Sequence, residues 1–161
     1  MKFISLCFLF LFSNTFELDT IRQNYIEAAV SEKSADAFHK SFEGVPDTHT
    51  DYTVLAYKAA STVLLAKYEG NPIKKMRHFN RGTDLLEAVI KKAPANYEAH
   101  LIRLNIQDNV PWITGYTSEI KEDKVYLMKN YNKQDDALKA FAKRYILQSE
   151  AFTDKEKAAF K

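Results

Sequence analysis

Residues 85–99 read LLEAVIKKAPANYEA, and this stretch decides the fold. Before Pro94 the apolar residues recur every three or four positions, which is the period of an amphipathic helix. Pro94 ends that helix because proline has no backbone N–H to donate, and Asn96 is a favoured N-cap residue. The stretch therefore predicts the end of one helix, a short turn and the start of the next helix.

The same pattern of helical stripes separated by short breaks continues in both directions. Breaks that contain Gly or Pro lie at 44–46, 70–72 and 111–115. Asn71 followed by Pro72 forms a helix start, because the missing N–H of proline costs nothing in the first turn. We expect helices over 18–28, 35–43 and 51–69, one from 72 up to Pro94, one from 97 up to Val110, and further helices starting near 118, after Asn132 and after Thr153.

The composition supports an all-helical protein. The 161 residues include only 4 Gly and 4 Pro, which argues against collagen-like chains and most all-β folds. A hydrophobic content of 46% argues against intrinsic disorder. Short connections place consecutive helices antiparallel to one another. We therefore predict an all-α fold of seven to eight helices in stacked antiparallel hairpins, with residues 51–69, which carry two apolar stripes, as the most buried helix.

The stretch around Pro94 resembles the boundary between two tetratricopeptide repeats. That family places a small residue, a bulky apolar residue, a small apolar residue and a proline at successive offsets of four, three and five, and Gly82, Leu86, Val89 and Pro94 follow this spacing. The chain also resembles small exported bacterial helical proteins that have no assigned activity. The resemblance implies a TPR-like α-α superhelix that binds a protein or peptide on a concave face.

The N-terminus has the features of an export signal. Met1-Lys2 is followed by ten largely apolar residues, 3–12, which form about 15 Å of helix and are too short to span a bilayer. We expect residues 1–15 to be a signal peptide and residues 16–161 a single helical domain, exported to the periplasm or secreted. The alternative is a buried N-terminal helix. Cys7 is the only cysteine, so the mature chain would contain no disulfide and no thiol nucleophile.

The charge balance argues against nucleic acid as a partner. The chain has 23 basic and 21 acidic residues, a formal net charge of +2. One basic cluster stands out at 74–81, which contains Lys74, Lys75, Arg77, His78 and Arg81. We interpret it as a solvated helix face, with an anion-binding or lipid-headgroup patch as the alternative. No segment of the mature chain has the length and hydropathy of a transmembrane helix.

The sequence lacks the common catalytic and cofactor-binding motifs. The sequence contains no G-x-S-x-G, H-E-x-x-H, C-x-x-C or phosphate-binding glycine pattern. Among the four histidines only His39 has a carboxylate at helical spacing, Glu43, and we interpret this pair as an ordinary surface pair rather than metal ligands. We therefore assign no catalytic residue, metal ligand or cofactor.

The candidate binding site is a polar stripe on the helix after Pro94. Asn96, His100, Arg103 and Gln107 recur at helical offsets between two apolar flanks, Tyr97/Leu101/Leu104 and Ala99/Ile102/Ile106. Guanidinium, imidazole and amide groups bind carboxylates and carbonyls through directional hydrogen bonds. The resemblance places this helix at the start of a repeat, where an inner helix would present such residues to a peptide. The alternative is a polar face that makes local bonds.

Two function hypotheses follow. The first is an exported, non-enzymatic helical-repeat binding or scaffold module for a protein or peptide, with Arg103 binding a partner carboxylate. The second is a small hydrolase-like enzyme whose acids or histidines converge only in three dimensions. A binding module predicts an elongated groove, whereas an enzyme predicts a closed pocket with several perturbed titratable groups.

Overall fold

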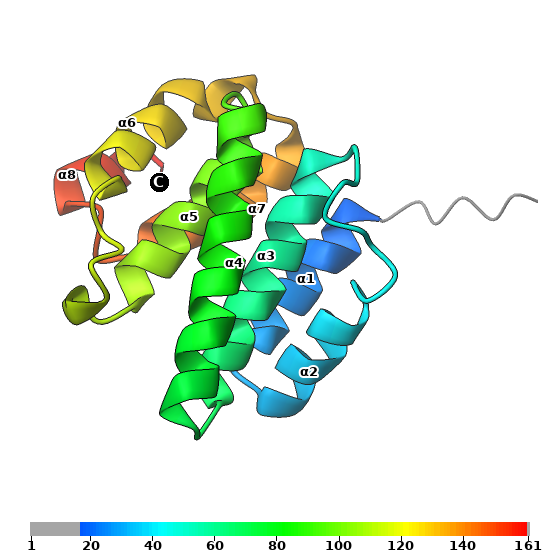
Figure 1. The fold of residues 1–161 in the computed structure, drawn as a ribbon. Coiled ribbons are helices and arrows are strands. Elements are labelled where there is room, and N and C mark those ends of the chain that lie inside the picture. Colours follow the sequence, from blue (N-terminus) through cyan, green and yellow to red (C-terminus); the bar gives the residue numbers. More distant parts are fainter. Residues whose placement is uncertain (1–16, 161) are drawn as a thin grey trace, which may run out of the picture.

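The computed structural model describes residues 17–160 of the chain, except for the side chain of Trp112. Within these residues the protein has eight α-helices, two short 3-10 turns and no strand, which confirms the predicted fold class and helix number (Figure 1). The predicted signal peptide, 1–15, lies outside the described residues. The elements in order are α1 (Leu18–Ala28), α2 (Glu32–Lys40), α3 (Tyr52–Tyr68), α4 (Pro72–Lys92), α5 (Tyr97–Asn109), η1 (Trp112–Thr114), α6 (Ile120–Asn130), η2 (Tyr131–Lys133), α7 (Asp136–Gln148) and α8 (Asp154–Ala158).

Local capping explains where several helices begin. The Asn71 side chain accepts hydrogen bonds from two backbone N–H groups in the first turn of α4, and Pro72 occupies the first helical position. The Asn96 side chain caps α5 in the same way. Thr153 and Glu156 form a complete capping box at the start of α8. These starts are encoded within a few residues, and the sequence predictions for them are confirmed.

The start of α7 differs from the prediction that Asn132 caps it. Residues 131–133 form the 3-10 turn η2, which is closed by a hydrogen bond from Gln134 N–H to Tyr131 O. The actual N-cap is Asp135, whose carboxylate accepts from Leu138 N–H at 2.9 Å. Both residues are good N-caps, and the 3-10 turn determines that the second one is used.

Helices α3 and α4 form a long antiparallel pair through the middle of the molecule (Figure 1). Gly82 of α4 lies directly against the backbone of α3. A Cβ at this position would meet Val63 Cγ2 at 2.5 Å and Ala59 O at 2.8 Å. A small residue here lets the two helix backbones approach closely, which explains a glycine inside a helix.

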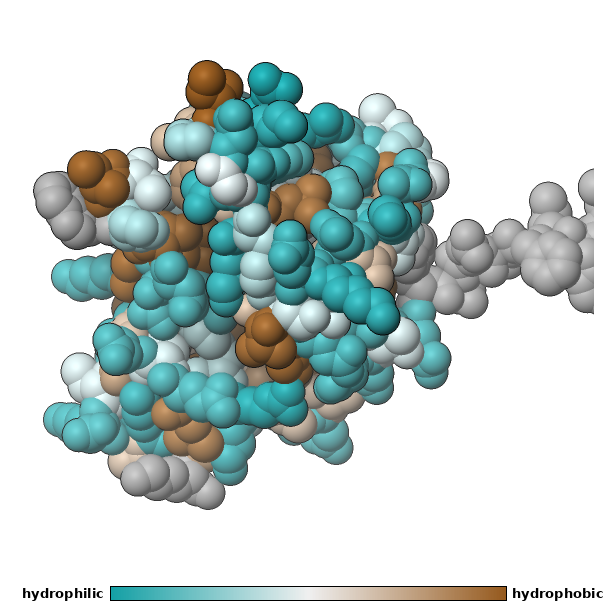
Figure 2. Space-filling model, turned by 90° about the horizontal axis from the view of Figure 1, so that it is seen from below, coloured by the Kyte–Doolittle hydropathy of each residue, from teal (hydrophilic) through white to brown (hydrophobic). Residues whose placement is uncertain are grey.

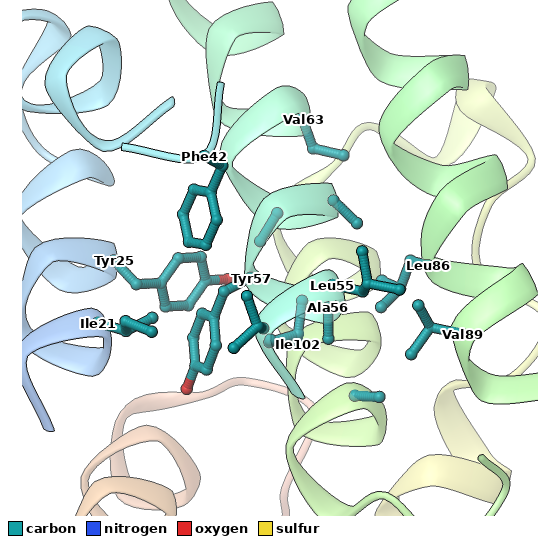
Figure 3. Packing of buried hydrophobic residues seen from close by; sticks show 14 of the residues in the cluster. Ile21, Tyr25, Phe42, Leu55, Ala56, Tyr57, Val63, Leu86, Val89 and Ile102 are labelled. Carbon is teal, nitrogen blue, oxygen red and sulfur yellow. The ribbon is translucent and has the colours of Figure 1, made fainter. Parts of the chain in front are cut away.

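The first hydrophobic core lies between α1, α2, α3 and α4. Ile21 and Tyr25 of α1 meet Tyr57 of α3, while Leu86 and Val89 of α4 pack on the other side of α3 (Figure 3). The rings of Tyr25 and Tyr57 pack edge to face with centroids 5.7 Å apart. Such aromatic contacts add directional packing to the apolar burial that holds the four helices together.

Helix α5 separates this core from a second one. Its face with Ala99, Ile102 and Ile106 packs into the first core. Its face with Tyr97, Leu101 and Leu104 packs into a second core, formed with the C-terminal helices. The two flanks predicted from the sequence are therefore both confirmed as core.

The most buried helix is α5 and not, as expected, α3. Ten of the 13 residues of α5 are buried, against ten of the 17 residues of α3. The reason is that α5 has neighbours on its polar sides as well as on its apolar sides. Helix α5 crosses behind α4 at an angle and does not continue a regular stack (Figure 1). The tetratricopeptide-like superhelix therefore stays a prediction.

The sequence predicts no transmembrane helix in the mature chain. Among the helices of residues 17–160, none combines the length and apolar character that a membrane crossing requires.

Candidate functional site

The predicted polar stripe of α5 faces α6, and Arg103 lies at its centre. Arg103 donates from Nε to Oδ2 and from Nη2 to Oδ1 of Asp123, each over 2.7 Å. Its Nη1 donates to Glu87 Oε2 of α4 at 2.9 Å. The side chain is 4% exposed. The guanidinium thus joins α4, α5 and α6 in one buried ion-pair network.

His100 binds the same carboxylate. Its Nδ1 lies 2.7 Å from Asp123 Oδ1, and its Nε2 lies 3.0 Å from the backbone oxygen of Pro94. A carboxylate and a carbonyl oxygen both accept hydrogen bonds, so each ring nitrogen of His100 faces an acceptor. The ring also packs on Tyr126 of α6, with centroids 4.2 Å apart. His100 and Arg103 thus both bind Asp123, and Arg103 binds Glu87 as well.

Asn96 and Gln107 lie at the two ends of the stripe. The Asn96 side chain caps α5 and donates from Nδ2 to Thr53 Oγ1 at 2.9 Å. Gln107 donates from Nε2 to Glu119 Oε2 at 2.7 Å. In the described part of the chain, Gln107 Oε1 is the one buried side-chain polar atom that lacks a hydrogen-bond partner. The stripe therefore contacts α3 at one end and the start of α6 at the other.

The electrostatics of the network favour the charged form of Arg103. Burial by itself lowers the pKa of Arg103, but the hydrogen bonds and charge of Asp123, and then of Glu87, outweigh it and raise that pKa. Tyr116, which donates to Glu87 Oε1 at 2.5 Å, has its pKa raised by burial and by that hydrogen bond. Arg103 stays charged and Tyr116 stays a neutral donor at physiological pH.

The structure corrects the expectation that this stripe is an open binding face. All four residues come together as the spacing predicts, but His100, Arg103 and Gln107 are buried. The carboxylate bound by Arg103 is Asp123 of the same chain. Sequence spacing shows which residues share a helix face, but not which other helix covers it.

Sequence reasoning missed a second buried ion pair on the other polar side of α5. Arg22 of α1 donates from Nη2 to Glu98 Oε1 at 2.7 Å and from Nε to Oε2 at 3.0 Å. Tyr57 of α3 donates to Glu98 Oε2 at 2.5 Å. A signal was present, because Glu98 interrupts a helix whose flanks are both apolar. A carboxylate in that position needs a buried cation or donor.

An apolar groove of about 400 Å³ lies at the end where α3 turns into α4. Its lining is mainly apolar, with Val63 of α3, Met76 and Phe79 of α4, and Ile106 of α5. Figure 2 views this end of the molecule and shows hydrophobic side chains at the surface between hydrophilic ones. Apolar residues recur along α4 at helical spacing, but those at its start are surface, since Ile73 is 73% and Met76 53% exposed.

A polar recess adjoins the apolar groove. Asn105 and Asn109 of α5 line both. On the far side of these amides lie Tyr145 and Ser149, whose hydroxyls donate to Asp108. Together the two hollows present apolar surface followed by side-chain amides, which can bond a peptide backbone.

No metal centre is present in the described part of the chain, where no three His, Cys, Asp or Glu residues are grouped to hold an ion. His39 and Glu43 lie at a different recess, between α2, α3 and α4. The His39 ring binds Ser61 Oγ of α3 at 3.1 Å through Nδ1.

The fold and the groove define a helical protein with an apolar concave surface, and comparison with known proteins adds no family. No protein-family model matches the chain, and neither a curated protein nor a solved structure matches it.

Proposed function

We propose that this protein is a non-enzymatic binding module that holds a protein or peptide partner in the apolar groove. The observation that carries the proposal is the groove itself, which leaves Met76 half exposed beside buried apolar surface of three helices. Apolar side chains of a partner segment would be removed from water there, which favours binding by roughly 25 cal/mol per Å². The adjoining amides of Asn105 and Asn109 would bond the backbone of the same segment.

The charge of the groove indicates the chemistry of the partner. Its lining includes Lys67 and Lys75 but no carboxylate. Lys75 is exposed on α4, where it can meet a negative charge at the rim. We therefore assign the groove a segment with apolar side chains flanked by acidic residues.

The stripe on α5 has a positioning role in this proposal. Arg103 and His100 hold α6 through Asp123, and Glu87 holds Tyr116 in the connection before α6. Tyr116 also packs edge to face on Phe79, a groove residue, with centroids 5.9 Å apart. Since Val110, Pro111 and Thr114 of the same connection line the groove, the network supports one of its walls.

A binding module rather than an enzyme is also favoured by where the perturbed groups lie. Arg22, Tyr57, Arg103 and Tyr116 have raised pKa values and are engaged in the ion-pair networks around Glu98 and Glu87. In the groove itself Tyr25 has its pKa raised by burial, and its hydroxyl donates to Asn105. These groups have structural partners, which supports a role in folding.

The test is selection of peptides from a random display library on the full mature chain. An enriched peptide is then measured by titration calorimetry against Met76→Glu and against Val125→Glu as a matched control. Val125 is an exposed apolar residue of α6, 59% exposed, outside the groove. Neither side chain is core, so both variants should fold.

We expect acidic, apolar peptides to be enriched and Met76→Glu to weaken their binding at least tenfold, or about 1.4 kcal/mol. Val125→Glu should bind as the unmodified protein does, and Lys75→Glu should weaken binding. Equal loss in both glutamate variants, or binding that ignores Met76, would overturn the proposal.

We infer from residues 1–15 that the protein is exported to the periplasm or secreted. The short basic start and the apolar stretch at 3–12 support this inference. Mass spectrometry of the protein from its native host should find a mature N-terminus near Phe16. An intact Met1 would contradict export by a cleaved signal.

A further inference from the structure

A second recess, of about 270 Å³, lies between α2, α3 and α4, apart from the apolar groove. Six ionisable side chains line it: His39, Glu43, Asp47, Lys58, His78 and Arg81. They come from all elements around the recess, including the connection between α2 and α3. The basic cluster of the sequence is thereby divided, since His78 and Arg81 face this recess while Lys75 lines the groove.

One of the cations, Lys58, is already partly neutralised. Lys58 forms a salt bridge with Asp47 and also donates to the backbone oxygen of Val45 at 2.6 Å. By contrast, His78 and Arg81 have no hydrogen bond or ion pair within residues 17–160. They lie one turn apart on α4, so their side chains share the same side of the helix.

The hydrogen bonds of His39 determine which of its nitrogens is available. Ser61 Oγ donates its proton to Lys58 O at 2.7 Å, so it must accept from His39 Nδ1–H. In the neutral ring Nε2 then carries the lone pair, and it has no partner among the described residues. When the ring takes up a proton, Nε2–H becomes a free donor at the recess.

The surroundings of His39 are positive. Burial lowers the pKa of His39, and the charges of His78, Arg81 and Lys58 lower it further, while Glu43 opposes them. A bound anion would offset this repulsion between cations. A metal ion is disfavoured because Arg81 is permanently charged and would repel it.

We propose that this recess binds a small oxyanion, a phosphate or carboxylate group, through Arg81, His78 and His39. Arg81 offers the two parallel N–H donors that suit an oxyanion, His78 adds a ring N–H donor, and the protonated ring of His39 adds Nε2–H. Lys58 and Asp47 form an ion pair without net charge at the edge of the recess. The carboxylate of Glu43 repels an anion and therefore limits the affinity of the recess. Because the bound anion stabilises the protonated ring of His39, affinity is highest in mildly acid solution. It falls as the pH rises and His39 loses its proton.

The experiment is a titration of the full mature chain with sodium sulfate, at constant ionic strength set with chloride. Sulfate keeps its charge across the range in which histidine titrates, so any pH dependence comes from the protein. Binding is followed by NMR of the histidine rings near pH 5.5 and again near pH 8. The variants are Arg81→Gln and, as the matched control, Arg77→Gln, which removes the same charge from α4 outside the recess.

We expect saturable shifts of the His39 and His78 resonances that weaken on going to the higher pH. Arg81→Gln should lower the affinity at least tenfold, and Arg77→Gln should change it less than twofold. Inorganic phosphate, a phosphate monoester and a small dicarboxylate then distinguish which oxyanion-bearing ligand fits. Unsaturable shifts, equal loss in both variants, or shifts confined to His49 and His100 would overturn the proposal.

Discussion

Arg103 of α5 binds Asp123 of α6 through two parallel hydrogen bonds of 2.7 Å, and both side chains are nearly or wholly buried. His100 Nδ1 lies 2.7 Å from the same carboxylate, so one acidic residue holds two side chains of the neighbouring helix. This relationship explains why α5 has polar residues in its interior-facing surface. Each charge there has a partner of opposite sign, which a buried charge requires.

Replacing Asp123 by Asn should destabilise the fold strongly. Asp123 is fully buried, and the loss of its charge leaves the buried Arg103 with only the half-exposed Glu87 as counter-charge. We expect a loss of about 3–5 kcal/mol in the free energy of unfolding, measured by urea denaturation. Glu87→Gln is the control. Because the Glu87 side chain is 41% exposed, this substitution should lower the free energy of unfolding by about 1 kcal/mol or less. Equal costs for the two variants would contradict a network centred on Asp123.

Replacing Gly82 by Ala should destabilise the α3–α4 pair. Alanine is the better helix former by about 1 kcal/mol, but the new Cβ would lie 2.8 Å from the backbone oxygen of Ala59. We expect a net loss of about 1–3 kcal/mol, read from thermal or urea unfolding. Gly70→Ala serves as control because a Cβ there meets nothing within 4 Å, so its effect should stay near zero. A stabilised Gly82→Ala variant would show that the helices can move apart freely.

Truncating Leu86 to Ala should cost about 2–5 kcal/mol, because Leu86 is fully buried and a cavity would remain between α3 and α4. Met76→Ala, on the same helix, should change stability by less than about 0.5 kcal/mol because Met76 is half exposed. Both changes in the free energy of unfolding are measured from urea midpoints, with the denaturant slope m unchanged. Similar costs at the two positions would mean that the start of α4 is packed in solution.

The stability of the protein should fall in mild acid through His39. Burial and, after it, the charge of His78 hold the pKa of His39 below its ordinary value of 6.5. The unfolded chain therefore binds a proton more readily than the folded one. The contribution of His39 is complete above pH 6.5 and is lost as the pH falls through its lower folded-state pKa.

The measurement is urea unfolding of the unmodified protein and of His39→Gln between about pH 5 and pH 8. As the pH is lowered, the free energy of unfolding should fall less for His39→Gln than for the unmodified protein. Added sulfate should reduce the acid loss of the unmodified protein, if the recess binds an oxyanion. Parallel pH profiles for the two proteins would exclude His39 as the source.

The sequence by itself determined the helices, most of their starts and the two apolar flanks of α5. These features depend on residues close together in the chain: Asn71 and Asn96 cap the turns that follow them, and an apolar period of three to four residues marks each flank. The close approach at Gly82 was also predictable, because a small residue within an apolar stripe has few other uses. Where two good caps competed, at Asn132 and Asp135, local information did not suffice.

Only the tertiary structure decided what the polar stripe of α5 contacts. The spacing of Asn96, His100, Arg103 and Gln107 fits an open binding face and a buried network equally well. Asp123 lies 20 residues beyond Arg103, and its place opposite the guanidinium depends on how α6 packs across α5. The groove has the same origin, since Met76 belongs to a stripe that reads as core and becomes surface where no helix covers it. Helix-helix packing is set by many side chains together, so no single motif encodes which face stays open.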